Sequence, residues 1–350
     1  MSLADKLNYY LQLSQALIKL RFHNAGEGDK AFFRVLNREP AILLLALHDR
    51  DFSPLHEAIG PKPGYFLFNL WGSRETGRSI RKVVQFVRRK NRRYPHHSYV
   101  FLCNSPEEET LLKDAGLEAV LCNHNCWIDE HLFRPDPAES KRFDAVYDAN
   151  ISPYKRHGLA TEIQNLALIS FRHPVLFNHG YAQKVRRELD HAHWHNDPLA
   201  DDFSFLTTEQ VVSILNQSRV GLCLSAVEGA MYASIQYLLC GLPVVSTASK
   251  GGRDVFFEDE YALIVADDSR AVASGVREMI NRNIPPDAIR NRVIERMTEH
   301  RQTFTDLLQS IFDRHQSGQL ATDVWPEIFR HKMGLAYLPF DQGIAELRTC

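Results

Sequence analysis

The chain lacks the features that would tie it to a membrane or to nucleic acid. No apolar run in its 350 residues approaches the roughly 20 residues that a membrane-spanning helix needs. The stretch 1–20 has no basic start followed by an apolar block, so it does not resemble a secretory signal. The formal net charge is −2, which argues against a nucleic-acid binder. We therefore expect a cytoplasmic protein.

Cysteine is also sparse. The six cysteines are scattered and mostly surrounded by apolar residues, so we expect buried free thiols in a reducing compartment. Cys122 and Cys126 lack the second pair that a zinc site needs. The loop with His191, His193 and His195 has no cysteine beside it, and we expect no metal there. We find no internal repeat and no low-complexity tract.

The residues that are present predict an α/β protein. The composition, with 44% hydrophobic and 24% charged residues, is that of a soluble globular protein, and the length suits two cores. After about 40 mainly helical residues, apolar runs of strand length alternate with helical patterns, which predicts a parallel sheet. The predicted strands are Ala41–Leu47, Tyr65–Leu70, Ser98–Cys103 and Ala119–Cys122, and the predicted helices are Glu75–Arg93 and Pro106–Ala115.

A second series follows a break at Phe133–Arg142, where proline and charge replace the hydrophobic pattern, as in a linker. We expect domains at 1–138 and 139–302, and a helical tail at 303–350 that packs back on the body. The predicted strands of the second series are Ala145–Asp148, Pro174–Asn178, Gly221–Ser225, Val244–Val245 and Ala262–Val265. Its predicted helices are Leu159–Ser170, Thr208–Gln217, Ala230–Cys240, Arg270–Asn281 and Asp287–His315.

The most informative segment is Val220–Thr247, whose pattern is strand, short loop, helix and strand. Glu228 and Gly229 lie in the turn where the strand gives way to the helix. Such a turn lies at the carboxyl end of a parallel sheet and faces a helix N-terminus, whose N–H groups and dipole attract phosphate. Because open α/β sheets bind ligands at this edge, the segment predicts a phosphate-bearing ligand.

Four pieces of sequence, in a consistent order, carry a family resemblance. They are Asn125 to Asp129 with Phe133-Arg134-Pro135, the element Ala149–Lys155, Glu228 followed after seven residues by Gln236 and then Leu-Cys-Gly-Leu-Pro-Val-Val, and Gly251-Gly252. Together they resemble the retaining GT-B glycosyltransferases called group 1, or family 4. The resemblance implies an α/β GT-B fold, in which two Rossmann-like domains with parallel sheets face a cleft.

The resemblance also implies an activity and a site. Group 1 enzymes transfer a sugar from a nucleotide-sugar donor to an acceptor, here expected to be a glycan or lipid-linked, without a metal or a further cofactor. Lys155 would neutralise the leaving diphosphate, on which charge develops in the transition state, and Glu228 would hold the donor sugar. His48 is a candidate because family members often place a histidine at such a strand end; Asn69 and Trp71 end the next strand. The other residues expected around the donor are Asn150, Arg156, Gly229, Ala230, Met231, Tyr232, Gln236, Gly251, Gly252 and Arg253.

The chain departs from the family pattern at two positions. Gln236 replaces the second glutamate of the motif, although an amide can still bond a ribose hydroxyl. Asn150 replaces the usual arginine and so removes a cation, which Arg156 or Arg253 could supply. Two other functions therefore stay open. One is a non-catalytic GT-B protein that binds a nucleotide or a partner; the other is a GT-B sugar-nucleotide epimerase, which needs no acceptor.

Each candidate also has an ordinary structural interpretation. Glu228 could cap the following helix, Lys155 could be a surface lysine, and Gly251-Gly252 could form a tight turn. The region Arg74–Arg93 has nine basic residues against the single acid Glu75, and its apolar residues recur at helical spacing. It is either an amphipathic helix with a solvated basic face or a contact with an anionic membrane surface or a phosphorylated lipid acceptor.

Overall fold

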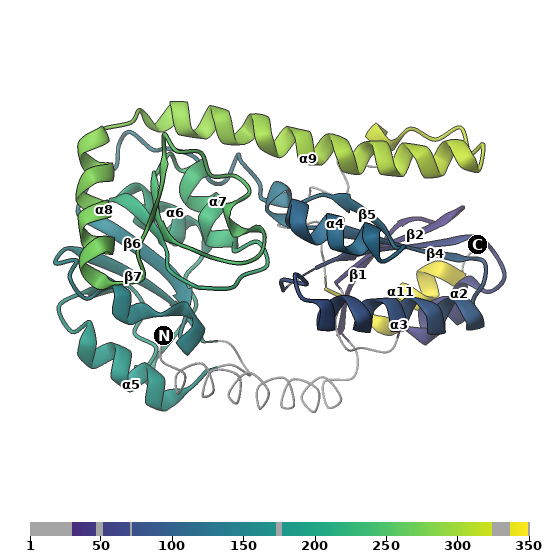
Figure 1. The fold of residues 1–350 in the computed structure, drawn as a ribbon, viewed down its shortest axis with the longest axis horizontal. Coiled ribbons are helices and arrows are strands. Elements are labelled where there is room, and N and C mark those ends of the chain that lie inside the picture. The colour runs from purple at the N-terminus through teal and green to yellow at the C-terminus, as the bar shows by residue number, and fades with distance from the viewer. Residues whose placement is uncertain (1–29, 47–51, 71, 173–176, 324–336, 349–350) are drawn as a thin grey trace.

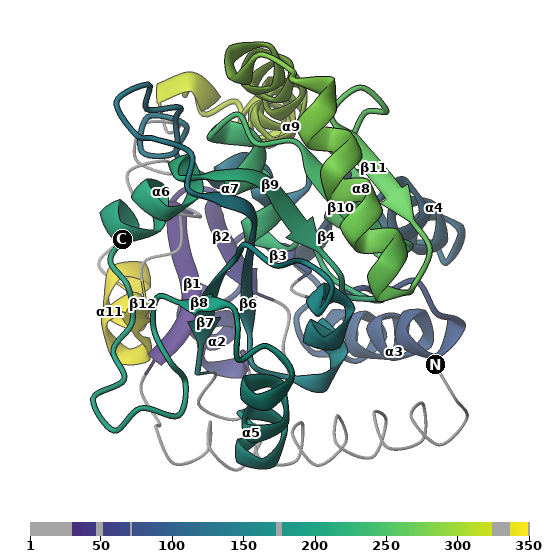
Figure 2. The ribbon, with the colours of Figure 1, turned by 90° about the vertical axis from the view of Figure 1, so that its left-hand side faces the viewer.

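The computed structural model describes residues 30–46, 52–70, 72–172, 177–323 and 337–348. Two six-stranded sheets lie side by side, and a long helix, α9 (Pro286–Arg314), runs along both of them (Figure 1). Figure 2 looks at the molecule from the side of the C-terminal sheet, with the strands of the N-terminal sheet behind it. The predicted GT-B arrangement of two Rossmann-like sheets is confirmed.

The N-terminal sheet has the strand order β12-β1-β2-β3-β4-β5. The four strands that the sequence predicted in this half run parallel to one another. They are β2 (Ala41–Ala46), β3 (Gly64–Asn69), β4 (His97–Cys103) and β5 (Glu118–Leu121). β2 and β3 are buried along their whole length. Helices cover both faces of this sheet (Figure 1), which is why its strands are unbroken apolar runs in the sequence.

The strand β1 (Lys30–Asn37) corrects the expectation that the first 40 residues are mainly helical. It pairs antiparallel with β2, and β12 (Tyr337–Pro339) pairs antiparallel with β1. Only residues 38–40 separate β1 from β2. So short a connection permits an antiparallel pair, whereas a parallel pair needs a crossover of a dozen residues or more.

The helix α3 (Gly77–Arg93) confirms the predicted amphipathic helix. It begins after Thr76, whose hydroxyl accepts the N–H of Ser79 at 3.2 Å. Ile80, Val83 and Val87 are buried on the sheet, and most of the basic side chains are exposed on the opposite face. The other helices of this half are α2 (Ser53–Ile59), α4 (Pro106–Asp114) and α11 (Phe340–Arg348).

The C-terminal sheet has the order β11-β10-β9-β6-β7-β8, and its pairs are parallel. The strands predicted at β6, β9, β10 and β11 and the helices predicted at α6, α7 and α8 are confirmed. The bounds are β6 (Phe143–Asn150), β8 (His193–Trp194), β9 (Ser218–Cys223), β10 (Val244–Thr247), β11 (Ala262–Val265), α6 (Thr208–Asn216), α7 (Tyr232–Leu239) and α8 (Ser269–Arg282).

The prediction of a helix over Leu159–Ser170 is wrong. The chain forms the short 3₁₀ helix η3 (His157–Ala160) and then β7 (Leu166–Phe171), which is buried between β6 and β8. A fully buried strand shows no alternation, so its apolar run cannot be told from a helix by period. The strand predicted over Pro174–Asn178 lies mostly outside the described residues, and Asn178 itself is the N-cap of α5 (His179–Glu188).

The helix α9 ties the two halves together. It contacts α7 in the C-terminal half and both β5 and the 3₁₀ helix η1 (His124–Trp127) in the N-terminal half. The expected boundary between residues 302 and 303 falls inside this continuous helix. After it, β12 and α11 return to the N-terminal sheet, where α11 contacts α2 and β1. No helix of the described ranges is long and apolar enough to cross a membrane.

The cysteines have the expected surroundings. The five described ones, Cys103, Cys122, Cys126, Cys223 and Cys240, are all free and buried. Cys122 and Cys126 lie close together, with their sulfur atoms 4.0 Å apart, and the hydrogen bond between them, followed by burial, raises the pKa of the Cys122 thiol. Protonated, buried thiols of this kind are unreactive.

Candidate functional site

The loops at the carboxyl ends of three adjacent strands meet at one edge of the C-terminal sheet. The strands are β10, β9 and β6, in that order in the sheet. The loops that follow them, 151–156, 224–231 and 248–253, therefore lie side by side. They carry most of the residues that the sequence predicted around a donor, at the edge where open α/β sheets bind their ligands.

Lys155 and Glu228 form a buried ion pair between Nζ and Oε1, with side chains only 8% and 11% exposed. Lys155 ends the 3₁₀ helix η2 (Pro153–Lys155) after β6, and the hydroxyl of Tyr147 donates to its carbonyl oxygen. Ser225 Oγ donates to the same Glu228 oxygen at 2.6 Å. Burial is the largest single influence and lowers the pKa of Lys155, but the charge and hydrogen bond of Glu228, together with Tyr154 and Cys223, outweigh it and raise the lysine pKa. The sheet edge therefore holds a cation at neutral pH.

The loop 229–231 has its carbonyl groups occupied and its N–H groups free. The oxygen of Gly229 accepts the N–H of Gly252 at 2.6 Å, and the oxygen of Met231 accepts Ser234 Oγ at 2.8 Å. Within the described chain, the N–H groups of residues 229, 230 and 231 donate no hydrogen bond. Consecutive free amides at the start of a helix, here α7, bind anions.

Gly251 and Gly252 lie where the two halves of the molecule touch. Gly251 has φ +99°, and a Cβ there would lie 1.7 Å from the carbonyl oxygen of Glu228. A Cβ on Gly252 would lie 2.2 Å from the carbonyl oxygen of Asn104, in the loop after β4. Only glycine fits at either position. The N–H of Gly251 donates to Glu75 Oε2 at 2.9 Å, so this predicted phosphate-binding amide holds a carboxylate of the N-terminal half.

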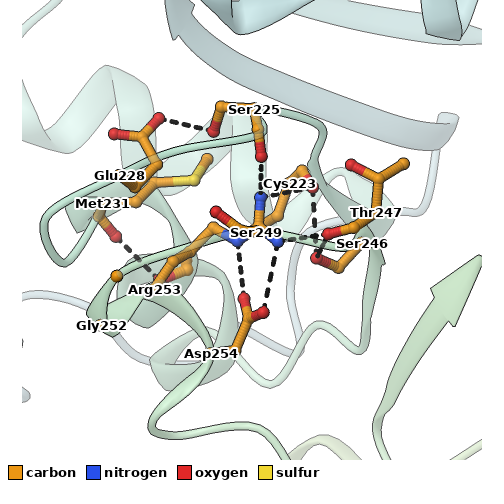
Figure 3. Close-up of polar contacts among 12 residues, drawn as sticks. Cys223, Ser225, Glu228, Met231, Ser246, Thr247, Ser249, Gly252, Arg253 and Asp254 are labelled. Carbon is orange, nitrogen blue, oxygen red and sulfur yellow. Dashed lines mark hydrogen bonds and ion pairs between the residues drawn. The ribbon is translucent and has the colours of Figure 1, made fainter. Parts of the chain in front are cut away.

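Arg253 has a fully buried guanidinium whose N–H groups all donate within the chain (Figure 3). Nη1 donates to the carbonyl oxygens of Cys223 and Ser225 at 3.0 and 2.6 Å, Nη2 donates to that of Thr247, and Nε donates to Asp254 Oδ1 at 2.6 Å. These bonds tie the loop and η4 (Gly252–Asp254) to the ends of β9 and β10. A contact with diphosphate would require some of them to break, and that role of Arg253 stays a prediction.

Arg156 follows Lys155 with φ 53°, and it is also engaged within the chain. Nη1 pairs with Asp267 Oδ2 at 2.8 Å, Nη2 donates to Thr247 Oγ1, and Nε donates to the carbonyl of Leu224. Its guanidinium thus joins the loop after β6 to the loops after β9 and β11 and to the last residue of β10. This position beside Lys155 is the one that a substitute for the missing arginine would need.

The two positions that depart from the family pattern lie at the same edge. Asn150 ends β6; its Nδ2 donates to the hydroxyl of Tyr154 at 2.7 Å, and its buried Oδ1 has no hydrogen-bond partner among the described residues. Gln236 lies on α7 and is 4% exposed, and no described residue accepts from or donates to its side-chain amide. Both amides therefore retain hydrogen-bonding capacity for a ligand.

The structure describes only some of the remaining predicted site residues. His48 and Trp71 lie outside the described residues. Asn69 ends β3 and is buried, and neither polar atom of its amide has a hydrogen-bond partner among the described residues. The Tyr232 ring packs on His124, with centroids 4.9 Å apart. No group of three or more potential ligands that could hold a metal occurs in the described part, where the rings of His193 and His195 lie 4.5 Å apart.

Sequence reasoning missed the residues of the N-terminal half that reach this edge. They are Glu75, Asn104, Asn123 and, as a site residue, Asn125. The only sequence signal was that Asn125 belongs to the interdomain segment of the family resemblance. Their contacts depend on how the two halves meet, which a local pattern does not encode.

Comparison with known proteins identifies the class of fold. The fold is that of the GT-B glycosyltransferases. Residues 145–282, from β6 to α8, match the model of the family described as glycosyl transferases group 1. No curated protein matches the sequence.

Solved structures support the fold over most of the chain. The chain is similar to Anabaena HepE in complex with UDP, with a TM-score of 0.55 and 15% identity over 76% of this chain and 78% of that one. A glycosyltransferase from Rickettsia africae gives a TM-score of 0.51 and 13% identity over 89% and 83%. TarM gives 0.52 and 11% over 70% of this chain and 50% of its own.

Proposed function

We propose that the protein transfers a sugar from a nucleotide-sugar donor to a glycan or lipid-linked acceptor, with retention of configuration. One observation carries the proposal. The buried Lys155–Glu228 pair lies beside the free N–H groups of the loop 229–231, within the segment that matches the group 1 family. One cation and several N–H dipoles at a single edge of the sheet support the binding of a diphosphate there.

The proposed chemistry rests on electrostatics. Negative charge develops on the departing diphosphate, and preorganised donors that meet this charge lower the barrier most. Lys155 supplies the cation and the loop amides supply dipoles, so the proposal needs no metal ion. Glu228, held by Lys155 and Ser225, would bind hydroxyl groups of the donor sugar. In the proposed retaining step, the leaving phosphate takes the acceptor proton on the same face of the sugar, and no side chain acts as nucleophile.

We further propose that α3 brings the protein to an anionic membrane surface, where a lipid-linked acceptor would lie. The helix carries eight basic residues and no acid. Because the whole chain carries −2, the rest of it carries −10. Among these side chains, Arg93 pairs with Glu57 at 2.9 Å, Lys90 donates to Ser53 Oγ at 3.0 Å, and Arg88, Arg89 and Arg92 are exposed. A cationic strip on an otherwise acidic molecule suits an anionic lipid surface.

A thermal-shift screen over nucleoside diphosphates and nucleotide-sugars tests the proposed donor site. A ligand that binds only the folded state raises the melting temperature by mass action. Uridine nucleotides come first, since HepE is described in complex with UDP. The nucleotide-sugar that gives the largest rise in melting temperature is then incubated with candidate acceptors, and the anomeric configuration of the product is determined by NMR. If no ligand in the screen raises the melting temperature, the proposal is wrong.

A non-catalytic nucleotide-binding protein is the second candidate. It is favoured by Gln236, whose amide replaces the carboxylate of the family motif, and by Asn150, which replaces a cation. Nucleotide binding with neither transfer nor donor hydrolysis would support it. An epimerase would instead convert the donor without an acceptor, and product analysis on the donor alone separates that case.

A further inference from the structure

Two buried asparagines, Asn123 and Asn125, reach from the N-terminal half to the loops of the proposed donor site. They lie directly after β5, at the start of η1, and neither side chain is exposed. Burial of an amide is unfavourable unless its polar atoms are hydrogen-bonded, so the partners of these side chains indicate what they do.

Asn125 holds the loop after Glu228 by its carbonyl groups. Its Nδ2 donates to the carbonyl oxygen of Ala230 at 2.7 Å and lies 3.3 Å from that of Met231. Its backbone N–H donates to Asn123 Oδ1 at 2.9 Å, which fixes its position. Its own Oδ1 has no described partner, so the NH₂ end makes the bonds that orient the side chain.

Asn123 holds the second loop. Its Nδ2 donates to the carbonyl oxygen of Asn104, in the N-terminal half, and to that of Gly252, in the C-terminal half, at 2.7 Å in each case. One NH₂ group thus bridges the two halves of the molecule. Gly252 in turn donates its N–H to the carbonyl oxygen of Gly229, so the two loops and the two asparagines form one connected network.

The orientation of a held carbonyl also sets the orientation of an N–H group. In a trans peptide, the C=O and the N–H of the same plane point in opposite directions. With the carbonyl of Ala230 held by Asn125, the N–H of Met231 points away from Asn125, and it has no acceptor in the described chain. Met231 also has φ 54°, a conformation that persists only where its surroundings enforce it.

We propose that Asn125 is a positioning residue for diphosphate binding: its NH₂ group holds the loop 229–231 so that the free amides face the donor. The inference rests on the proposed function, because it assigns the amides a diphosphate. It adds that the N-terminal half sets the donor affinity of the C-terminal half through one side chain that itself does not touch the donor.

The test compares two substitutions of a buried asparagine by aspartate. Asn125→Asp places a carboxylate against the carbonyl of Ala230 and should turn the loop, which weakens binding of UDP or GDP by about tenfold or more, since bonds from amides to a charged group are lost. Asn216→Asp is the matched control. Asn216 is equally buried and donates to the carbonyls of Arg134 and Val212 at 3.0 and 3.1 Å, but it lies before β9 begins, at the opposite end of that strand from Glu228.

Affinity is measured by isothermal titration calorimetry on each folded variant, using whichever of UDP and GDP the wild-type chain binds more tightly, with melting temperatures measured in parallel. We expect both variants to be less stable and only Asn125→Asp to lose affinity. If the aspartate variant does not fold, Asn125→Ala takes its place in the test, because it removes the NH₂ group without adding a charge. Equal affinity of Asn125 variants and wild type would overturn the inference while the proposed function stands. If the wild-type chain binds neither, the comparison uses the nucleoside diphosphate with the largest shift in the thermal-shift screen, and failure to bind any nucleoside diphosphate would overturn both.

Discussion

Lys155 and Glu228 lie 73 positions apart in the chain, yet their side chains form a buried ion pair at the carboxyl edge of the C-terminal sheet. The pair joins the loop after β6 to the loop after β9, two strands that are neighbours in space because of the crossover topology. It also fixes the one cation that the proposed chemistry needs.

Replacing Lys155 by alanine should lower sugar transfer by about 10²–10³-fold, because the leaving diphosphate loses its cation. The measurement is the initial rate with saturating donor. Lys184→Ala, on an exposed part of α5, is the control and should keep the wild-type rate. Wild-type turnover in Lys155→Ala would show that this lysine has no part in the reaction.

Breaking the Lys155–Glu228 ion pair should lower the free energy of unfolding. Lys155→Met leaves Glu228 as an uncompensated buried charge, which typically destabilises a protein by about 3–5 kcal/mol. Adding Glu228→Leu removes that charge, so the double variant should lose less stability than the sum of the two single variants. Urea denaturation of the four proteins in a double-mutant cycle gives the coupling; purely additive losses would contradict the importance of the pair.

Arg253→Ala should be among the most damaging single substitutions for stability. It removes the guanidinium donor from the buried carbonyl oxygens of Cys223, Ser225 and Thr247 and leaves Asp254 without its partner, with an expected loss of about 3–5 kcal/mol. Arg292→Ala removes an exposed ion pair with Glu258 and should leave the melting temperature nearly unchanged. Differential scanning calorimetry checks both, and similar melting temperatures for the two variants would refute the prediction.

Stability should fall as the solution becomes acidic. Burial lowers the pKa of His124 and of His157 to about 3, with a smaller contribution from Lys155 at His157. In the unfolded chain both titrate near 6.5, so below that pH the unfolded state binds more protons and gains relative stability. The folded state therefore keeps its full stability with respect to these two histidines above pH 6.5, and it loses that stability as the pH falls towards 3. Melting temperatures across this range should drop less steeply for His157→Gln than for the wild type.

The basic face of α3 should determine binding to anionic vesicles. Arg88→Glu with Arg89→Glu reverses two exposed charges and should weaken binding at low salt by more than tenfold, at about 1 kcal/mol per basic residue near the surface. The matched control is Lys184→Glu with Arg187→Glu on α5. Flotation with vesicles of phosphatidylcholine, with and without phosphatidylglycerol, provides the measurement. Equal flotation of the wild-type chain on both would contradict the proposed membrane contact.

Much of the fold could be predicted from the sequence because buried parallel strands are short apolar runs bounded by turns. The runs at β2, β3, β4, β9 and β10 were recognised in this way. β7 was assigned to a helix because Leu166–Phe171 lacks alternation. β1 was missed although its partner β2 follows it after three residues; its other partner, β12, comes from the far C-terminal end of the described chain. β7 is held between β6 and β8, and β1 between β2 and β12, so pairing partners that include strands distant in sequence decide both structures.

The sequence by itself determined the class of fold and the segment that carries the predicted site, since the strand, turn and helix around Glu228 follow from local periodicity and from glycine at positions where no side chain fits. Only the tertiary structure decided which side chains meet there. It paired Lys155 with Glu228, fixed Arg253 inside the sheet edge, and brought Glu75, Asn123 and Asn125 across from the other half. The physical reason is that hydrogen bonds and ion pairs depend on distances of a few ångströms between atoms, and these distances are set by how the two sheets pack.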